Sequence, residues 1–122
     1  MAALVKCFVA VLILNLVTRG FCGCSVGDLT IGTVRSGKEV QGKAEWTVTV
    51  TNNCICAQSR IILYCGGFQS VEHVNPAILY KQGEDCILVH GTSLPASASV
   101  TFSYAWDPPA IFLPKSSVIA GC

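Results

Sequence analysis

Charged side chains are scarce in this chain. They make up 12% of its 122 residues, the formal net charge is +1, and no lysine or arginine has another beside it. Nucleic-acid binders and polybasic membrane binders need clustered basic residues, so neither class fits. Hydrophobic residues reach 52%, which excludes an intrinsically disordered chain. The sequence therefore predicts one folded domain of ordinary size.

Motifs for catalysis, cofactors and metals are also missing. No serine lies in a Gly-x-Ser-x-Gly context, and Gly66-Gly67 does not lead into the Gly-Lys-Ser/Thr of a phosphate loop. Glu84 and Asp85 are neighbours that point to opposite faces of an extended chain, so they do not flank one bond and are expected in a solvated loop. His73 and His90 have no metal-ligand spacing and are expected on the surface. We expect no enzyme, no cofactor and no metal.

Helical periodicity is nearly absent. A single turn is expected at Pro76–Lys81, with Asn75 as its cap. The clearest alternation is Trp46–Thr51, which points Trp46, Val48 and Val50 to one face and three threonines to the other. Further strands are expected at Leu29–Val34, Ile61–Cys65, Ile87–Val89, Val100–Trp106 and Val118–Ala120. About six or seven short strands with turns between them predict an all-β fold, an antiparallel β-sandwich, because parallel strands need long crossovers.

Residues 1–22 are predicted to be a secretory signal peptide. Lys6 precedes the apolar run Cys7–Val17, which small and polar residues follow. This run is too short to span a membrane, which takes about 20 apolar residues. Cleavage after Gly20 and cleavage after Cys22 both suit the small-residue preference, but only the second leaves an even number of cysteines. We therefore expect a secreted single domain, residues 23–122, with no membrane insertion after cleavage.

Six cysteines remain in that domain, and we expect them to form three disulfides: Cys24, Cys54, Cys56, Cys65, Cys86 and Cys122. Their spacing does not match the repeated Cys-x-x-Cys of structural zinc sites. On a strand, Cys54 and Cys56 point the same way, which favours two different partners. We expect bridges from this pair to Cys24 and Cys122, and a Cys65–Cys86 bond that closes the intervening segment on itself.

Aromatic side chains offer two interpretations. Trp46 alternates with valines, and Phe102 and Tyr104 alternate with serine and threonine, which is typical of a core. Exposed aromatic rings in a row on a sandwich would instead stack on sugars. Trp106 precedes Asp107-Pro108-Pro109, where a strand must stop, so it is the candidate exposed binding aromatic.

Several segments together resemble the tapetum determinant-like family of small secreted plant proteins. They are Gly37–Trp46, Val48–Cys54, Cys65–Phe68, Val74–Pro76, Asp85-Cys86, Phe102–Trp106 and the terminal cysteine. The likeness extends from about Cys24 to Cys122. Founding members have a longer N-terminal extension with a dibasic site and a wider spacing of the second and third cysteines, so this chain resembles the short branch.

The resemblance implies an extracellular signalling ligand. Founding members are recognised by a leucine-rich-repeat receptor kinase at the plant cell surface and direct cell-fate choice in the anther. We therefore expect a receptor-kinase ectodomain as partner and the apoplast as location. The alternative is an apoplastic carbohydrate- or cell-wall-binding module, with cell-wall carbohydrate as partner. No nucleic-acid partner is expected.

Overall fold

The computed structural model describes residues 24–120. The predicted signal peptide, its cleavage site and Cys122 lie outside this range. The described elements, in chain order, are η2 (Val26–Asp28), β1 (Leu29–Val40), β2 (Lys43–Asn52), β3 (Ala57–Tyr64), β4 (Leu79–Gln82), β5 (Asp85–Leu88), η3 (Val89–Gly91), β6 (Ser99–Ala105) and β7 (Leu113–Ala120). Within this range the chain is all-β, as predicted, and it contains no helix that is long and apolar enough to cross a membrane.

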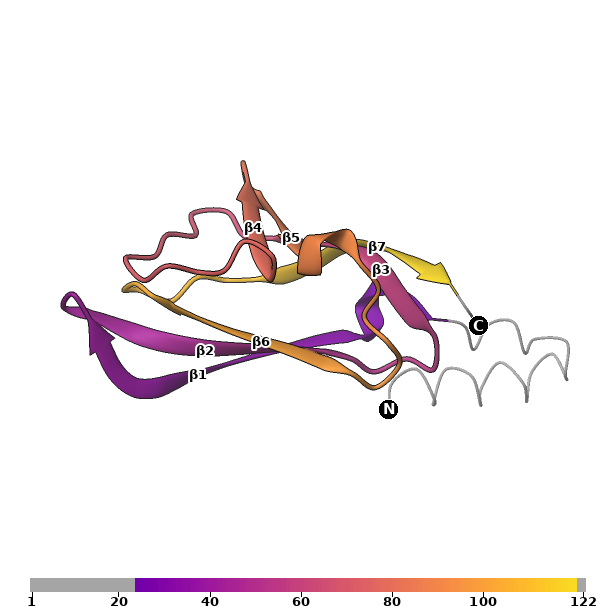
Figure 1. The fold of residues 1–122 in the computed structure, drawn as a ribbon, viewed down its shortest axis with the longest axis horizontal. Helices are drawn as coiled ribbons and strands as arrows, with labels where there is room; N and C mark the ends of the chain where they lie inside the picture. Colours follow the sequence, from indigo (N-terminus) through magenta and orange to yellow (C-terminus); the bar gives the residue numbers. More distant parts are fainter. Residues whose placement is uncertain (1–23, 121–122) are drawn as a thin grey trace, which may run out of the picture.

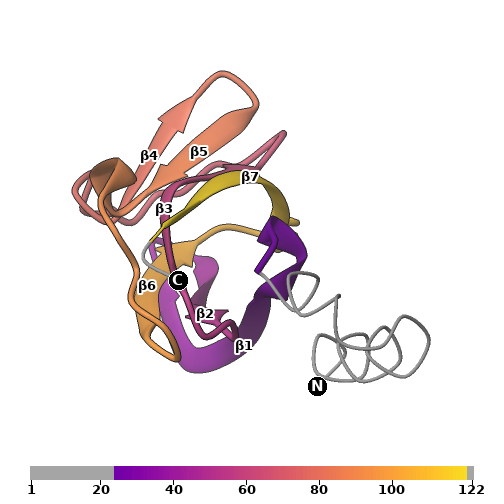
Figure 2. The same ribbon diagram turned by 90° about the vertical axis from the view of Figure 1, so that its right-hand side faces the viewer.

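Two antiparallel sheets lie one above the other (Figure 1). One sheet has the order β1-β2-β6 and the other has the order β4-β5-β3-β7. The view along the sandwich shows the first sheet curving beneath the second (Figure 2). The predicted β-sandwich is therefore confirmed.

The β2 alternation determines which side chains enter the core. Val48 and Val50 are fully buried, whereas the threonines that alternate with them point outward. From the opposite sheet, Ile61 and Leu63 of β3 are also fully buried. Because side chains alternate along each strand, one face of each sheet fills the space between the layers.

An aromatic cluster completes the core towards the end of β6. Tyr104 is fully buried, and its ring centroid lies 5.2 Å from that of Phe68 and 5.9 Å from that of Phe112. The Tyr104 hydroxyl accepts a hydrogen bond of 2.7 Å from the Ala110 amide. Burial raises the pKa of Tyr104, and this hydrogen bond partly offsets the rise. The predicted core position of Tyr104 is confirmed.

Strand boundaries differ from the sequence prediction in β1. The strand was expected to end at Val34 but continues to Val40, with a register shift between Arg35 and Glu39. Gly37 has φ 94°, which lets the chain make a bulge and resume pairing. β1 and β2 are then joined by the two-residue turn Gln41-Gly42, both with positive φ, as type I′ hairpins require.

The Pro76–Lys81 prediction is correct at its start and wrong at its end. The Asn75 side chain accepts from the Ala77 amide at 2.9 Å, which caps one turn. From Leu79 the chain is extended as β4 and pairs with β5 through the Gly83-Glu84 turn. Asp85 is therefore the first residue of β5 rather than part of a loop, and its carboxylate accepts from Lys115 Nζ at 2.8 Å. Glu84 is exposed in the turn, as expected.

Candidate functional site

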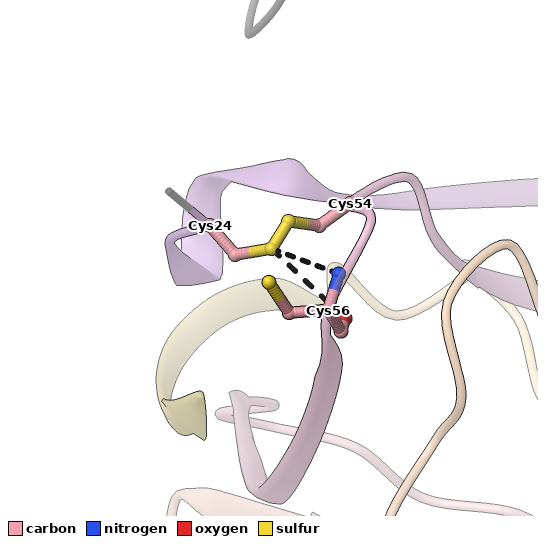
Figure 3. Close-up of side chains that lie close together, drawn as sticks. All are labelled: Cys24, Cys54 and Cys56. Atoms are coloured by element: carbon pink, nitrogen blue, oxygen red, sulfur yellow. Dashed lines mark hydrogen bonds between the residues drawn. A yellow bond between two sulfur atoms is a disulfide. The ribbon is translucent and has the colours of Figure 1, made fainter. Parts of the chain in front are cut away.

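The predicted cysteine sites lie in two places. Cys65 and Cys86 are bonded, with their Cα atoms 5.9 Å apart, which is the predicted closure of the segment between β3 and β5. Cys24 and Cys54 are bonded with Cα atoms 5.5 Å apart (Figure 3). The second bond fixes the start of the described chain to the β2–β3 connection.

Cys54 and Cys56 lie in the connection between β2 and β3, not on a strand as the sequence suggested. The sulfur atoms of Cys24, Cys54 and Cys56 lie within 4.8 Å of one another. The Cys56 amide donates to Cys24 Sγ at 3.3 Å (Figure 3). Cys56 is itself disulfide-bonded, and its predicted partner, Cys122, lies outside the described residues. Cysteine binds a metal ion as the free thiolate, and in this arrangement all three sulfurs are in disulfides.

A second cluster lies at the far end of the sandwich, where the β1–β2 turn, the β6–β7 connection and the segment after β3 gather (Figure 1). We call this region the hairpin end. It contains both tryptophans, and Trp46 Nε1 donates to the Trp106 carbonyl at 2.9 Å. The Arg35 guanidinium lies 5.5 Å from the Trp46 ring centroid, and Lys43 Nζ lies 4.9 Å from that of Trp106. Each indole therefore carries a cation over its ring.

Trp106, the candidate exposed binding aromatic, is half-buried rather than exposed. Its ring is not an open platform for a sugar, because it packs against the core and Lys43 lies over it.

Buried carboxyl groups lie at the same end. Glu45 is only 6% exposed, and Ser36 Oγ donates to its Oε1 at 2.6 Å. The Glu45 carboxyl also meets that of Glu72, which comes from the segment between β3 and β4. The Ser36 hydrogen bond lowers the pKa of Glu45, whereas burial, followed by the contact with Glu45, raises the pKa of Glu72.

An open depression of about 410 Å³ adjoins this carboxyl pair. Its lining is largely apolar and includes Phe68, Glu72, His73, Leu79, Tyr80 and Lys81. Tyr80 is 49% exposed at its rim. Tyr64 lies on the outer face of the four-stranded sheet, to which Tyr80 also belongs, and is 39% exposed. Its ring lies against Gly66, where a Cβ would clash with the phenol.

The outer face of the other sheet is different in character. It presents hydroxyl groups that pair across β2 and β6: Thr47 with Ser103 at 3.2 Å, Thr49 with Thr101 at 3.4 Å, and Thr51 with Ser99 at 2.7 Å. These pairs satisfy one another, as cross-strand Thr–Ser pairs commonly do. This face is therefore polar and solvated, and the exposed aromatic rings lie on the opposite sheet.

Sequence reasoning missed the carboxyl pair and the two exposed tyrosines. Glu45 and Glu72 meet only because the segment after β3 lies against β6, and their spacing in the sequence does not predict this contact. The alternation of Ile61–Cys65 does contain a signal for Tyr64, since it places this residue on the face opposite to Ile61 and Leu63. His73 and His90 are exposed, as predicted.

The fold and its cross-links define a class: a small β-sandwich stabilised by disulfides. Residues 25–120 match the family described as Tapetum determinant 1, C-terminal. This match covers most of the sequence, so the chain belongs to that family. The resemblance inferred from the sequence is thereby confirmed.

Two relatives show the extent of the similarity. The chain is 31% identical over 85 residues to TPD1 protein homolog 1 of Arabidopsis thaliana, which covers 67% of this chain and 48% of the relative. It is 34% identical over 92 residues to TPD1 protein homolog 1A of Oryza sativa subsp. japonica, which covers 67% of this chain and 41% of the relative. The chain thus spans less than half the length of these relatives. No solved structure matches it.

Proposed function

We propose that the protein is secreted and acts as an extracellular signalling ligand, which binds the ectodomain of a leucine-rich-repeat receptor kinase. By resemblance, the signal specifies cell fate in the anther or in other reproductive tissue. The observation that carries this proposal is the family match over residues 25–120, which includes the whole sandwich. Disulfides support the secreted location, because they persist in oxidising compartments.

The receptor-contact surface in this proposal is the hairpin end. Tryptophan and arginine are enriched among the residues that dominate binding energy at protein interfaces. Trp46, Trp106 and Arg35 lie together there, and the cations Arg35 and Lys43 are already positioned over the rings. Pre-positioned side chains lose little conformational entropy on binding.

We further propose that the protein is not an enzyme. The carboxyl pair at the hairpin end is directed inward: Glu45 is 6% exposed, and Oε1 of Glu72 is buried. A general acid or base must reach the atom whose proton it moves. The buried Glu45 is not placed to do so for a substrate in solution, and Glu72, which lines the depression, has its Oε1 buried.

Carbohydrate binding is the second candidate function, and the exposed tyrosines favour it. In this alternative the sugar-stacking rings are Tyr80 and Tyr64 rather than Trp106, because these two are 49% and 39% exposed on the outer face of the four-stranded sheet. Tyr80 also borders the depression, which has polar groups beside its apolar lining. Such a combination of ring and hydrogen-bonding groups is typical of small-ligand sites.

One experiment separates the two candidates. The secreted, oxidised protein is incubated with immobilised leucine-rich-repeat ectodomains and, in parallel, with insoluble cell-wall polysaccharides. The proposal predicts retention by a subset of ectodomains and recovery of the protein in the polysaccharide supernatant. Retention on polysaccharide with no ectodomain bound would favour the second candidate instead.

A further inference from the structure

The segment between β3 and β4, residues 65–78, lies along the open edge of β6. The Val71 amide donates to the Ala105 carbonyl at 3.0 Å, and the Ala105 amide donates to Ser70 Oγ at 3.0 Å. The Ser70 hydroxyl also accepts from the Glu72 amide at 3.1 Å and donates to the Glu72 carbonyl at 2.7 Å. These four hydrogen bonds fix Glu72 beside the end of β6.

The strand register then brings Glu72 to Glu45. Ala105 on β6 is the partner of Glu45 on β2, so only β6 separates a segment that is bonded to Ala105 from the Glu45 side chain. The two carboxyl groups make contact there. Among the described residues, Oε1 of Glu72 is the buried side-chain oxygen without a hydrogen-bond partner.

Two carboxyl groups can share a hydrogen bond only when one of them carries a proton. Glu45 accepts from Ser36 and is the better placed to be ionised, whereas Glu72, whose Oε1 is buried without a hydrogen-bond partner, is the better placed to keep the proton. The directions of the pKa shifts agree, because the pKa of Glu72 is raised and that of Glu45 is lowered. The Lys38 charge lowers the pKa of both carboxyl groups, but its effect is the smallest on each of them.

We propose that Glu45 and Glu72 form a proton-dependent latch, which holds residues 65–78 against β6 while the pair shares a proton and releases them when both carboxyls are ionised. The closed state binds the proton more tightly than the open state, so raising the pH favours opening. His73, Tyr80 and Lys81, which line the depression with Glu72, are the other charged or titratable groups at its rim. The latch does not depend on the identity of any receptor.

Opening is local rather than global. The Cys65–Cys86 disulfide holds the start of the segment, and Leu79, which is 4% exposed in β4, holds its end. Segments held at both ends by strong contacts open as separate units, at lower free energy than the whole domain. The depression is bounded by this segment, so its shape changes when the latch opens.

Amide hydrogen exchange tests the latch in the full oxidised protein between about pH 4.5 and pH 7.5. After correction for intrinsic exchange rates, protection of the Val71 and Ala105 amides is expected to fall as the pH rises. The expected fall is about tenfold for each unit by which the pKa of Glu72 is higher in the closed state than in the open state. Protection that stays constant over this range would overturn the proposal.

Three variants sharpen the test. Glu72→Gln keeps a donor towards Glu45 and does not ionise, so its protection is expected to be high and independent of pH. Glu84→Gln alters an exposed glutamate of the β4–β5 turn and should retain the wild-type profile, as should His73→Gln, which removes the neighbouring imidazole. A Glu72→Gln profile that still falls with pH would refute the assignment.

A second measurement covers the case in which Glu72→Gln does not fold. The side-chain carboxyl carbons of the wild-type protein are followed by NMR as the pH is raised. The latch predicts that Glu72 titrates above the usual range of glutamate and that the Glu45 signal responds in the same step. Titration of Glu72 within or below that usual range would contradict it.

Discussion

Asn52 is predicted to be among the most sensitive polar positions of the fold. It is the last residue of β2, it is fully buried, and its side chain lies within hydrogen-bond distance of five partners. The two N–H groups of Nδ2 are shared among three carbonyls, those of Cys56, Leu94 and Pro95, at 2.9, 3.0 and 3.2 Å. Oδ1 accepts from the Cys54 amide and from Gln58 Nε2, both at 3.1 Å. One side chain thus connects the cysteine loop, β3 and the segment before β6.

The cost of Asn52→Ala follows from the groups that it leaves unpaired. The Leu94 carbonyl keeps the Gln58 amide as a donor, and Gln58 Nε2 keeps the Ser25 carbonyl. The Cys56 carbonyl and the Cys54 amide lose their side-chain partner. Each buried group left unsatisfied costs about 1–3 kcal/mol, so the two groups together predict a loss of about 2–6 kcal/mol in the free energy of unfolding. This is a large part of the stability of a small domain, which is typically about 5–15 kcal/mol.

The adjacent Asn53 provides a matched control. Its side chain is exposed and donates one hydrogen bond, to Thr30 at 2.8 Å. Asn53→Ala is therefore expected to change stability by less than about 0.5 kcal/mol. Urea denaturation of both oxidised variants, followed by the fluorescence of Trp46 and Trp106, measures the difference. Equal costs for the two substitutions would refute the reasoning.

The remaining predictions concern the cross-link, one turn and one carboxyl. Replacing both Cys65 and Cys86 with Ala removes a disulfide between residues 21 apart. We expect the free energy of unfolding to fall by about 3 kcal/mol, measured as a lower denaturation midpoint. An unchanged midpoint would contradict a stabilising role for this disulfide. Gly42→Ala forces a side chain onto φ 79° and should cost about 1 kcal/mol, whereas Gly32→Ala, with open space around its Cβ, should cost less; the reverse order would be inconsistent with the turn. Because the pKa of Glu72 is raised in the folded state, stability should fall as the pH rises through that pKa, and Glu72→Gln should remove this slope in a pH series of thermal melts.

The sequence predicts the fold wherever alternation is regular. Trp46–Thr51 shows both the strand and its buried face, and the structure keeps both. The predicted end of the first strand is wrong at Gly37. A glycine suits either a turn that ends a strand or a bulge inside one, and here the pairing with β2 makes it a bulge. The prediction fails at Tyr80 for a similar reason, since β4 exists because it pairs with β5.

The candidate site is less predictable because it depends on contacts between distant segments. The end of β6 next to Trp106 follows from the prolines after it, but the cation over its ring requires the β1–β2 turn to bring Lys43 there. The Glu45–Glu72 pair depends on how residues 65–78 lie on β6, which no local pattern determines. The disulfide pairing of Cys65 with Cys86 was accessible, because the segment between them has little apolar periodicity and needs a covalent closure.

The central proposal is that the hairpin end binds a receptor ectodomain. The most direct measurement is the affinity of the secreted protein for the ectodomain that retains it, compared between Trp106→Ala and Tyr80→Ala. A truncated interface tryptophan that dominates binding costs about 2 kcal/mol or more. We therefore predict that Trp106→Ala weakens binding by at least about thirtyfold, while Tyr80→Ala, on the outer face of the other sheet, leaves it unchanged. Wild-type affinity in Trp106→Ala together with loss of binding in Tyr80→Ala would contradict the proposal.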